Sequence, residues 1–209
     1  MATNPHARLV LIRHGESEAN AANRFTGWAD PALTAIGRDQ AGAVARLLLA
    51  KGVRPTRIFQ SVLARCAETT TIITRVMETP DVPIMADPAL NERDYGALTG
   101  LNKAEAAERF GEAQVRQWRR SYAVAPPEGE SLRDTAARVL AYYVRTMLPG
   151  IMLGGTTLIV SHGNTLRALA MAIDGLGTAQ IETFDLSTGA TILYTLDATT
   201  AVIDRTVLN

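Results

Sequence analysis

Short apolar runs alternate with amphipathic stretches along most of the chain. Residues 8–13 ("RLVLIR") form the first run, and their branched aliphatic side chains are typical of a buried strand. Apolar residues then recur three and four positions apart after Thr34, at Ala41, Val44, Ala45, Leu48 and Leu49. This spacing places them on one face of a helix, and Gly52 and Pro55 follow where that helix should end. The pattern predicts a strand followed by an amphipathic helix.

The same alternation continues to the end of the chain. Further strands are predicted at 56–61, 82–87 and 156–161. Further helices are predicted at 62–79, 102–122, 131–147 and 165–176. Ser131 and Asp134 have the spacing of a capping box, which marks the start of the third of these helices. Two β-rich runs, 190–197 and 200–208, finish the chain.

Strands that alternate with helices indicate an α/β protein with a mainly parallel sheet. Each parallel crossover needs a helix to carry the chain back, so helices cover both faces and form a three-layer fold. The final two strands have no helix between them, and we expect an antiparallel strand at an edge of the sheet. We treat residues 1–209 as a single domain. In such sheets ligands bind beyond the carboxyl ends of the strands.

Composition excludes several classes of partner. The 209 residues are 47% hydrophobic and 20% charged, and Lys plus Arg and Asp plus Glu both number 21. A chain without net charge has no overall field that would attract nucleic acid or an acidic membrane. No cationic segment followed by a long apolar one occurs at the start, so we predict a cytoplasmic protein. A single cysteine, Cys66, permits no internal disulfide and no thiolate metal site.

Two of the three histidines occur in the same local setting. His14 ends the run "LVLIRHG" and His162 ends "TLIVSHG", and a glycine and then a predicted helix follow each of them. A parallel sheet would bring both to one edge. A structural histidine at a strand end is the alternative for either residue alone, but the repetition favours a shared function. His6 lies in a polar leader and shows no such pattern.

The chemistry that these residues suggest is attack on phosphorus. A neutral imidazole nitrogen is a nucleophile, and the guanidinium of Arg13 can donate to phosphate oxygens in a planar fork. A protonated His162 near the bound phosphate would add positive charge. Because no Cys/His cluster or dense carboxylate group accompanies the histidines, we predict no metal site.

At this point the sequence resembles a known family. "RHGES" followed by a distant "SHGN" is similar to the histidine phosphatase superfamily. "FTGWAD", "LNERDYGALTGLNK", "WRRSY", "EGESL" and "HGNTLRAL", in this order, resemble the cofactor-dependent phosphoglycerate mutases. The resemblance covers nearly the whole chain and implies the phosphoglycerate mutase-like fold.

The resemblance also implies an activity and a set of site residues. The activity is interconversion of 3-phosphoglycerate and 2-phosphoglycerate in glycolysis and gluconeogenesis, through a phosphohistidine that 2,3-bisphosphoglycerate primes. His14 would carry the phosphoryl group, and Arg13, Arg65 and His162 would bind it. Glu92 would exchange the proton, a role that needs a carboxyl group whose pKa is held up. Contacts to substrate would come from Asn20, Thr26, Gly27, Tyr95, Lys103, Arg119, Arg120, Gly163 and Asn164. Members of the family suggest a homodimer or a homotetramer.

Three features depart from the family pattern. Asp94 stands where relatives usually carry histidine, the stretch 119–132 lacks a long insertion, and the chain ends with 204–209 without the extended tail of longer relatives. A pocket that is more open to water would raise phosphatase side activity. The alternatives are therefore a phosphatase of the same superfamily that acts on small phosphate monoesters, and a noncatalytic sensor of phosphorylated metabolites. Without the family match, Arg65, Glu92 and the Arg119–Arg120 pair would be taken for solvated surface residues.

Overall fold

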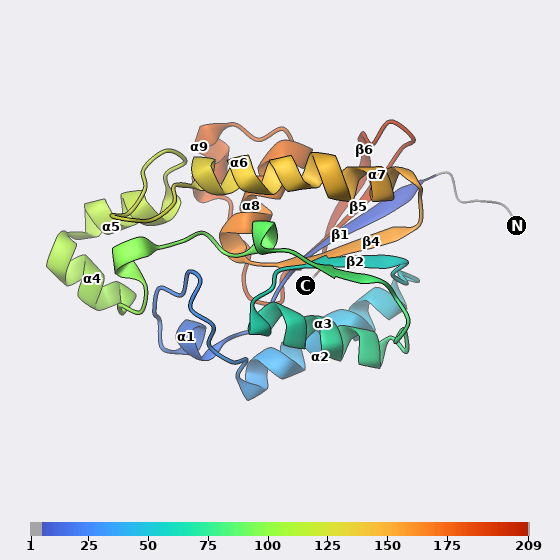
Figure 1. Ribbon diagram of the computed structural model, residues 1–209, viewed down its shortest axis with the longest axis horizontal. Helices are drawn as coiled ribbons and strands as arrows, with labels where there is room; N and C mark the ends of the chain where they lie inside the picture. The colour runs from blue at the N-terminus through green and yellow to red at the C-terminus, as the bar shows by residue number, and fades with distance from the viewer. Residues whose placement is uncertain (1–5, 209) are drawn as a thin grey trace, which may run out of the picture.

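The computed structural model describes residues 6–208. The protein is built around one six-stranded sheet (Figure 1). Its strands lie in the order β3-β2-β4-β1-β5-β6. Strands β3, β2, β4 and β1 are parallel, whereas β5 runs antiparallel to β1 and β6 antiparallel to β5. The predicted α/β class and the antiparallel edge are therefore confirmed. The strand bounds are β1 Ala7–Arg13, β2 Arg57–Gln60, β3 Ile84–Ala86, β4 Thr156–Ser161, β5 Thr191–Leu196 and β6 Val202–Leu208.

Helices cover the two faces of the sheet, as Figure 1 shows. One face carries α2 (Ala35–Ala50) and α3 (Ala64–Val76). The other carries α6 (Leu132–Tyr142), α7 (Leu148–Met152) and α8 (Gly163–Ile173). Beyond the sheet lie α1 (Glu18–Ala21), α4 (Lys103–Phe110), α5 (Glu112–Arg120) and α9 (Thr178–Thr183). Within residues 6–208, no helix is both long and apolar enough to cross a membrane.

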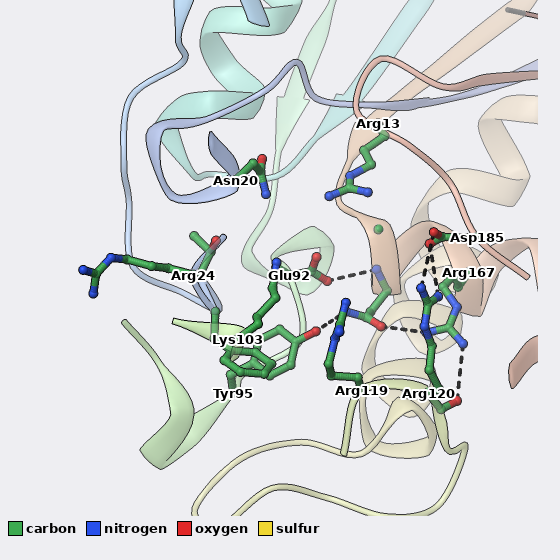
Figure 2. Close-up of a pocket in the computed structure, with 14 residues that line it drawn as sticks. Arg13, Asn20, Arg24, Glu92, Tyr95, Lys103, Arg119, Arg120, Arg167 and Asp185 are labelled. Atoms are coloured by element: carbon green, nitrogen blue, oxygen red, sulfur yellow. Dashed lines mark hydrogen bonds and ion pairs between the residues drawn. The ribbon is translucent and has the colours of Figure 1, made fainter. Parts of the chain in front are cut away.

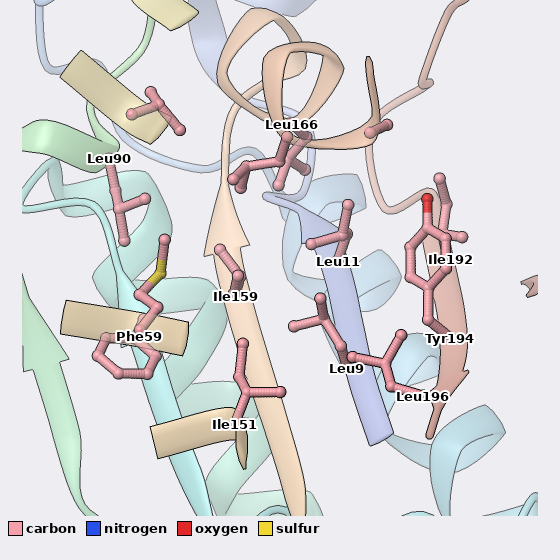
Figure 3. Packing of buried hydrophobic residues seen from close by; sticks show 14 of the residues in the cluster. Leu9, Leu11, Phe59, Leu90, Ile151, Ile159, Leu166, Ile192, Tyr194 and Leu196 are labelled. Carbon is pink, nitrogen blue, oxygen red and sulfur yellow. The ribbon is translucent and has the colours of Figure 1, made fainter. Parts of the chain in front are cut away.

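Strand β1 divides its side chains between two hydrophobic cores. Leu9 and Leu11 belong to the core under α6, α7 and α8, which Figure 3 shows. Val10 and Ile12 belong to the core under α2 and α3. Successive strand residues point to opposite faces, and each buried aliphatic side chain stabilises the fold by about 1.5–3 kcal/mol. The continuous apolar run therefore reflects a strand that is covered on both sides.

Two predicted helices differ from the observed ones in ways that local geometry explains. The predicted helix at 102–122 is divided into α4 and α5 at Gly111, whose φ of +86° is a conformation that glycine adopts without strain. The capping box of Ser131 and Asp134 is confirmed at the start of α6. That helix then continues through one π turn, Tyr143–Met147, into α7. The sequence pattern missed α1, α9 and two 3₁₀ turns, Pro88–Leu90 and Gly96–Leu98.

A small separate core fixes α4 and α5 beyond the strand ends. Phe25, Leu98, Ala106, Val115 and Trp118 are buried together there. Main-chain hydrogen bonds join the Phe25 loop to the segment before α4, from the Phe25 amide to the Leu101 carbonyl (3.0 Å) and from the Gly100 amide to the Phe25 carbonyl (2.8 Å). This packing holds the basic residues of both helices over the carboxyl ends of the strands.

Candidate active site

His14 and His162 meet at the carboxyl edge of the sheet. Strands β1 and β4 are neighbours with Arg13 opposite Ser161, so the residue after each strand reaches the same edge. The two imidazole centroids are 5.0 Å apart at an interplanar angle of 63°, and both rings are buried. The predicted convergence is confirmed. The predicted helix directly after each histidine is right only for His162, which is the N-cap residue of α8. After His14 the chain makes a loop and then the single turn α1.

Both imidazoles are neutral in this environment. Burial lowers the pKa of His14 well below its ordinary value, and the charges of Arg13 and Arg65 lower it further. Burial, with Arg65 as the next cause, likewise lowers the pKa of His162. The expected protonation of His162 concerns the state with phosphate bound, whereas no anion here offsets the neighbouring arginines. The Nδ1 of His14 lies 2.6 Å from the Gly15 carbonyl oxygen. The tautomer that donates this bond leaves the lone pair on Nε2.

Arg65 is a buried cation close to both histidines. It lies in the first turn of α3 with 1% of its surface exposed. Its guanidinium donates to the carbonyl oxygens of Ala29 (2.8 Å) and Gly27 (3.0 Å), while its Nε has no hydrogen-bond partner. The alternative of a solvated arginine is therefore wrong. An unpartnered buried N–H is costly, so this side chain is arranged to receive a further acceptor.

Arg13 holds a second guanidinium at the same edge. It donates to the carbonyl oxygen of Leu186, and its buried Nε also lacks a partner. Gly163 lies against it, because a Cβ built on this glycine would be 3.5 Å from the Arg13 Cζ. This is an ordinary van der Waals distance, so Gly163 and the Arg13 guanidinium are direct neighbours at this edge.

Glu92 is held at both its main chain and its side chain. Its Oε1 accepts hydrogen bonds from the amides of Arg93 (2.8 Å) and Asn164 (3.1 Å). Its carbonyl oxygen accepts from the Trp28 Nε1 (2.6 Å) and from the Arg138 guanidinium (2.8 Å). The residue is 8% exposed and lines a cavity, so the alternative of a free surface glutamate is wrong. The carboxyl group is fixed at the cavity wall (Figure 2).

A polar cavity of about 170 Å³ contains most of the predicted ligand-binding residues (Figure 2). The predicted residues that line it are Arg13, Asn20, Thr26, Glu92, Tyr95, Lys103, Arg119, Arg120, Gly163 and Asn164. The other predicted residues, His14, Gly27, Arg65 and His162, are not part of the lining. His14, Arg65 and His162 are nearly fully buried, and Arg13 and Gly163, which neighbour the histidines in sequence, connect them to the wall.

Four lining residues were not predicted from the sequence. They are Arg24, Phe25, Arg167 and Asp185. Arg24 and Phe25 directly precede Thr26, and Arg167 lies one helical turn after Asn164 on α8, so adjacency and helical spacing could have indicated them. Asp185 lies in the loop between α9 and β5, and no pattern in the sequence marked it.

Lys103 and Tyr95 form part of the cavity wall. Burial lowers the pKa of Lys103, and the nearby cations Arg119 and Arg13 add to this effect although Tyr95 opposes it. The Tyr95 hydroxyl accepts hydrogen bonds from Arg93 (3.1 Å) and from the Asn164 side chain (3.2 Å). Clustered cations that lower one another's pKa favour an anionic ligand between them.

Asp94 makes a structural contact beside this cavity. Its Oδ1 accepts a hydrogen bond from the Gly96 amide at 2.8 Å, which fixes the 3₁₀ turn that follows. Gly96 has a φ of +51°, and a Cβ there would lie 2.2 Å from the Pro127 carbonyl oxygen. Asp94 is not among the lining residues. The departure from the family pattern thus stabilises a turn beside the site.

Metal-ligating side chains do not gather in the part of the chain that the structure describes. No group of three or more His, Cys, Asp or Glu residues within 6–208 could hold a metal ion. Arginine, lysine and amide side chains dominate the cavity instead.

Comparison with known sequences places this site in a family. Residues 9–208 match the model of the histidine phosphatase superfamily (branch 1). A 2,3-bisphosphoglycerate-dependent phosphoglycerate mutase from Methylobacterium sp. (strain 4-46) is 52% identical over 201 residues, which cover 96% of this chain and 97% of that protein. A protein of the same name from Chelativorans sp. (strain BNC1) is 48% identical over 200 residues, with 96% and 97% covered.

Solved structures show the same fold in phosphatases. A mycobacterial glucosyl-3-phosphoglycerate phosphatase in complex with VO3 has a TM-score of 0.77 at 29% identity, with 90% of this chain and 92% of that chain covered. A putative alpha-ribazole-5'-P phosphatase from Escherichia coli has a TM-score of 0.80 at 26% identity, with 97% and 96% covered. The family model and the two relatives at about half identity agree over almost the whole length. This chain therefore belongs to the histidine phosphatase superfamily and, within it, to the family of 2,3-bisphosphoglycerate-dependent phosphoglycerate mutases.

Proposed function

We propose that this protein interconverts 3-phosphoglycerate and 2-phosphoglycerate and depends on 2,3-bisphosphoglycerate to prime its phosphohistidine. The observation that carries the proposal is the excess of positive charge in a cavity beside a neutral imidazole. The cationic lining residues are Arg13, Arg24, Lys103, Arg119, Arg120 and Arg167, and the only carboxylates among the lining residues described are Glu92 and Asp185. A ligand with several anionic groups fits this charge distribution, and phosphoglycerates are such ligands.

His14 is proposed as the nucleophile. With its Nδ1 directed at the Gly15 carbonyl, its Nε2 carries the lone pair that forms the bond to phosphorus as the ester oxygen leaves. The lowered pKa keeps this nitrogen unprotonated at neutral pH. In each turnover the N–P bond of the primed His14 breaks as its phosphoryl group passes to the free hydroxyl of 3-phosphoglycerate, which gives 2,3-bisphosphoglycerate. Once this intermediate has reoriented, Nε2 takes the other phosphoryl group as its ester oxygen leaves, and 2-phosphoglycerate is released.

Arg13, Arg65 and His162 are proposed to bind the phosphoryl group in transfer. The two arginines each keep a buried Nε without a partner, and phosphate oxygens are strong acceptors for such donors. Negative charge on the phosphoryl oxygens would raise the pKa of His162 from its lowered value and make protonation of this imidazole favourable. Positioning and charge stabilisation supply most of the catalysis in such transfers.

Glu92 is proposed to exchange the proton with whichever hydroxyl reacts. Its Oε1 is engaged by two amides, which leaves Oε2 for the ligand. Lys103, Arg119 and Arg120 are proposed to bind the carboxylate and the second phosphate. The remaining contacts proposed are Asn20, Thr26, Gly27, Tyr95, Gly163 and Asn164.

Two further proposals concern the whole molecule. We propose that residues 1–209 form one domain, which is supported by a sheet whose adjacent strands β1 and β5 come from opposite ends of the chain. From the family resemblance we propose a cytoplasmic homodimer or homotetramer. Light scattering after size exclusion would measure the oligomeric state, and a monomer would contradict it.

One assay tests the activity. The protein is given 3-phosphoglycerate with and without a catalytic amount of 2,3-bisphosphoglycerate, and both 2-phosphoglycerate and free phosphate are followed. Isomerisation stimulated by the bisphosphate supports the mutase, and we expect a metal chelator to leave the rate unchanged. Phosphate release without isomerisation would instead support a phosphatase, the activity named for the mycobacterial structural relative. Neither reaction would indicate a noncatalytic sensor.

A further inference from the structure

Asp185 is one of two carboxylates among the described residues that line the cavity, and the other charged lining residues are cationic. Its two carboxylate oxygens face the two terminal nitrogens of Arg120, at 3.2 Å (Oδ1) and 3.3 Å (Oδ2) (Figure 2). Both residues line the cavity together with Lys103 and Arg119. A carboxylate in a bidentate pair with an arginine occupies the donors that a ligand carboxylate or phosphate would use.

The segment that carries Asp185 contacts two separate cations of the cavity. The Leu186 carbonyl oxygen accepts from Arg13, while the adjacent Asp185 side chain accepts from Arg120. Leu186 is itself buried in the core under α6, α7 and α8. The Gly189 amide bonds the His14 carbonyl at 3.2 Å, which fixes the loop a second time. The main chain at Asp185 is therefore anchored, and only its side chain needs to rotate to release Arg120.

The pair between Asp185 and Arg120 is weak enough to be displaced. The Asp185 side chain is 63% exposed and that of Arg120 is 34% exposed. The two distances between Asp185 and Arg120 exceed the roughly 2.7–2.9 Å of tight charge-assisted hydrogen bonds. Exposed ion pairs add little stability, so an anion held by several cations at once can compete successfully for Arg120.

We propose that Asp185 is a specificity-determining residue that competes with the distal anionic group of the ligand for Arg120. The inference rests on the proposed function, since that distal group is the carboxylate or second phosphate of a phosphoglycerate. Asp185 weakens binding of ligands that carry a second anion and has less effect on ligands that carry only the transferring phosphate. It thereby limits how tightly the doubly phosphorylated species is held.

Titration calorimetry with two matched probes tests this inference. The probes are 3-phosphoglycerate, which has a phosphate and a carboxylate, and glycerol 3-phosphate, which lacks the carboxylate. For Asp185→Asn we expect 3-phosphoglycerate to bind about threefold to fivefold more tightly than to the unmodified protein, the range that an exposed ion pair allows. We expect the affinity for glycerol 3-phosphate to rise by a smaller factor.

A matched control separates this effect from a general change in charge. Glu68→Gln removes one carboxylate from another exposed ion pair, with Arg38, that lies between α2 and α3 away from the cavity. We expect this variant to bind both probes as the unmodified protein does. In an Arg120→Gln background, Asp185→Asn should lose most of its effect on 3-phosphoglycerate, because the contested donor is gone.

The outcomes distinguish the inference from the proposed function. If the unmodified protein binds both probes but Asp185→Asn changes neither affinity, or changes both by the same factor, the inference is overturned and the proposed function stands. An undiminished effect in the Arg120→Gln background would also overturn the inference. If the unmodified protein binds neither phosphate ester, the proposed function and the inference are overturned together.

Discussion

The imidazoles of His14 and His162 lie with their centroids 5.0 Å apart although the residues are far apart in sequence. Their proximity follows from the parallel pairing of β1 with β4, which aligns Arg13 with Ser161. Both rings are buried, which excludes the water that would stabilise their charged forms. The pair is thus a product of the sheet topology, and its neutrality is a product of its burial.

The two buried histidines should make the stability of the protein fall in mild acid. An unfolded histidine has a pKa of about 6.5, whereas burial lowers the pKa of both rings in the folded protein. Below about pH 6.5 the unfolded chain therefore binds more protons, and the free energy of unfolding decreases as the pH falls. Urea denaturation between pH 7.5 and pH 5 should show a loss of up to about 1.4 kcal/mol per pH unit for each histidine.

Histidine variants test whether this pH dependence of stability arises from His14 and His162. His162→Gln should reduce the slope of stability against pH, whereas His6→Gln, which changes an exposed residue, should leave it unchanged. A slope that is identical in His14→Gln, His162→Gln and the unmodified protein would contradict the assignment.

Arg138 should be required to position Glu92. Its guanidinium donates to the carbonyl oxygens of Ala89 (2.8 Å), Asn91 (3.0 Å) and Glu92 (2.8 Å), and it pairs with Glu130. Arg138→Lys keeps the charge but lacks the planar fork, so most of these bonds are lost. We expect a loss of about 2–3 kcal/mol in the free energy of unfolding and a lower kcat. Wild-type values of both in this variant would show that the loop is held by other contacts.

Cys66 should be unreactive in the folded protein. Its Sγ lies 3.4 Å from the His162 Nε2 and is buried on α3. Burial raises the pKa of the thiol, which stays protonated at neutral pH and is therefore a poor nucleophile. Iodoacetamide at pH 7.5 should leave the native protein unmodified and should alkylate one thiol after denaturation in guanidinium chloride. Rapid alkylation of the native protein would contradict this environment.

Gly37 should not tolerate even one added methyl group. A Cβ at this position would lie 2.1 Å from the Glu16 carbonyl oxygen, in the loop that follows His14. Gly37→Ala should therefore displace that loop, destabilise the protein by about 3 kcal/mol and lower the activity strongly.

A second glycine on the same helix provides the control for Gly37. The Cβ of Gly42→Ala would lie 3.3 Å from the flexible end of the Arg46 side chain. We expect a stability within about 1 kcal/mol of the unmodified protein, because alanine favours a helix. Equal stabilities for the two variants would contradict the account of the close approach at Gly37.

The pattern of apolar residues in the sequence was sufficient to predict the mainly parallel sheet and the meeting of His14 and His162 at one of its edges. Strand β1 is apolar on both faces, and "SHG" repeats the setting of "RHG", so the parallel topology follows from local pattern. The interruption at Gly111 and the π turn at Tyr143–Met147 were not predicted, because helical periodicity does not show where the backbone conformation changes within a helical stretch.

The surroundings of Glu92 could not be predicted by periodicity. Glu92 lies outside every strand and helix, and Arg138, which holds its carbonyl oxygen, is 46 positions away. Only the family resemblance identified Glu92 and Arg65 as site residues, because their local sequence suggested solvated surface side chains. Asp185 belongs to no motif that we used, and its contact with Arg120 exists only through the placement of the loop before β5.

Mapping of the phosphorylated residue tests the central claim most directly. The protein is incubated with 2,3-bisphosphoglycerate, quenched in alkali, digested, and analysed by mass spectrometry under conditions that preserve phosphohistidine. We predict an acid-labile phosphate on His14, lost in His14→Ala and retained in His6→Ala. Phosphate found on another residue, or label that persists in His14→Ala, would contradict the assignment of His14 as the phosphate carrier.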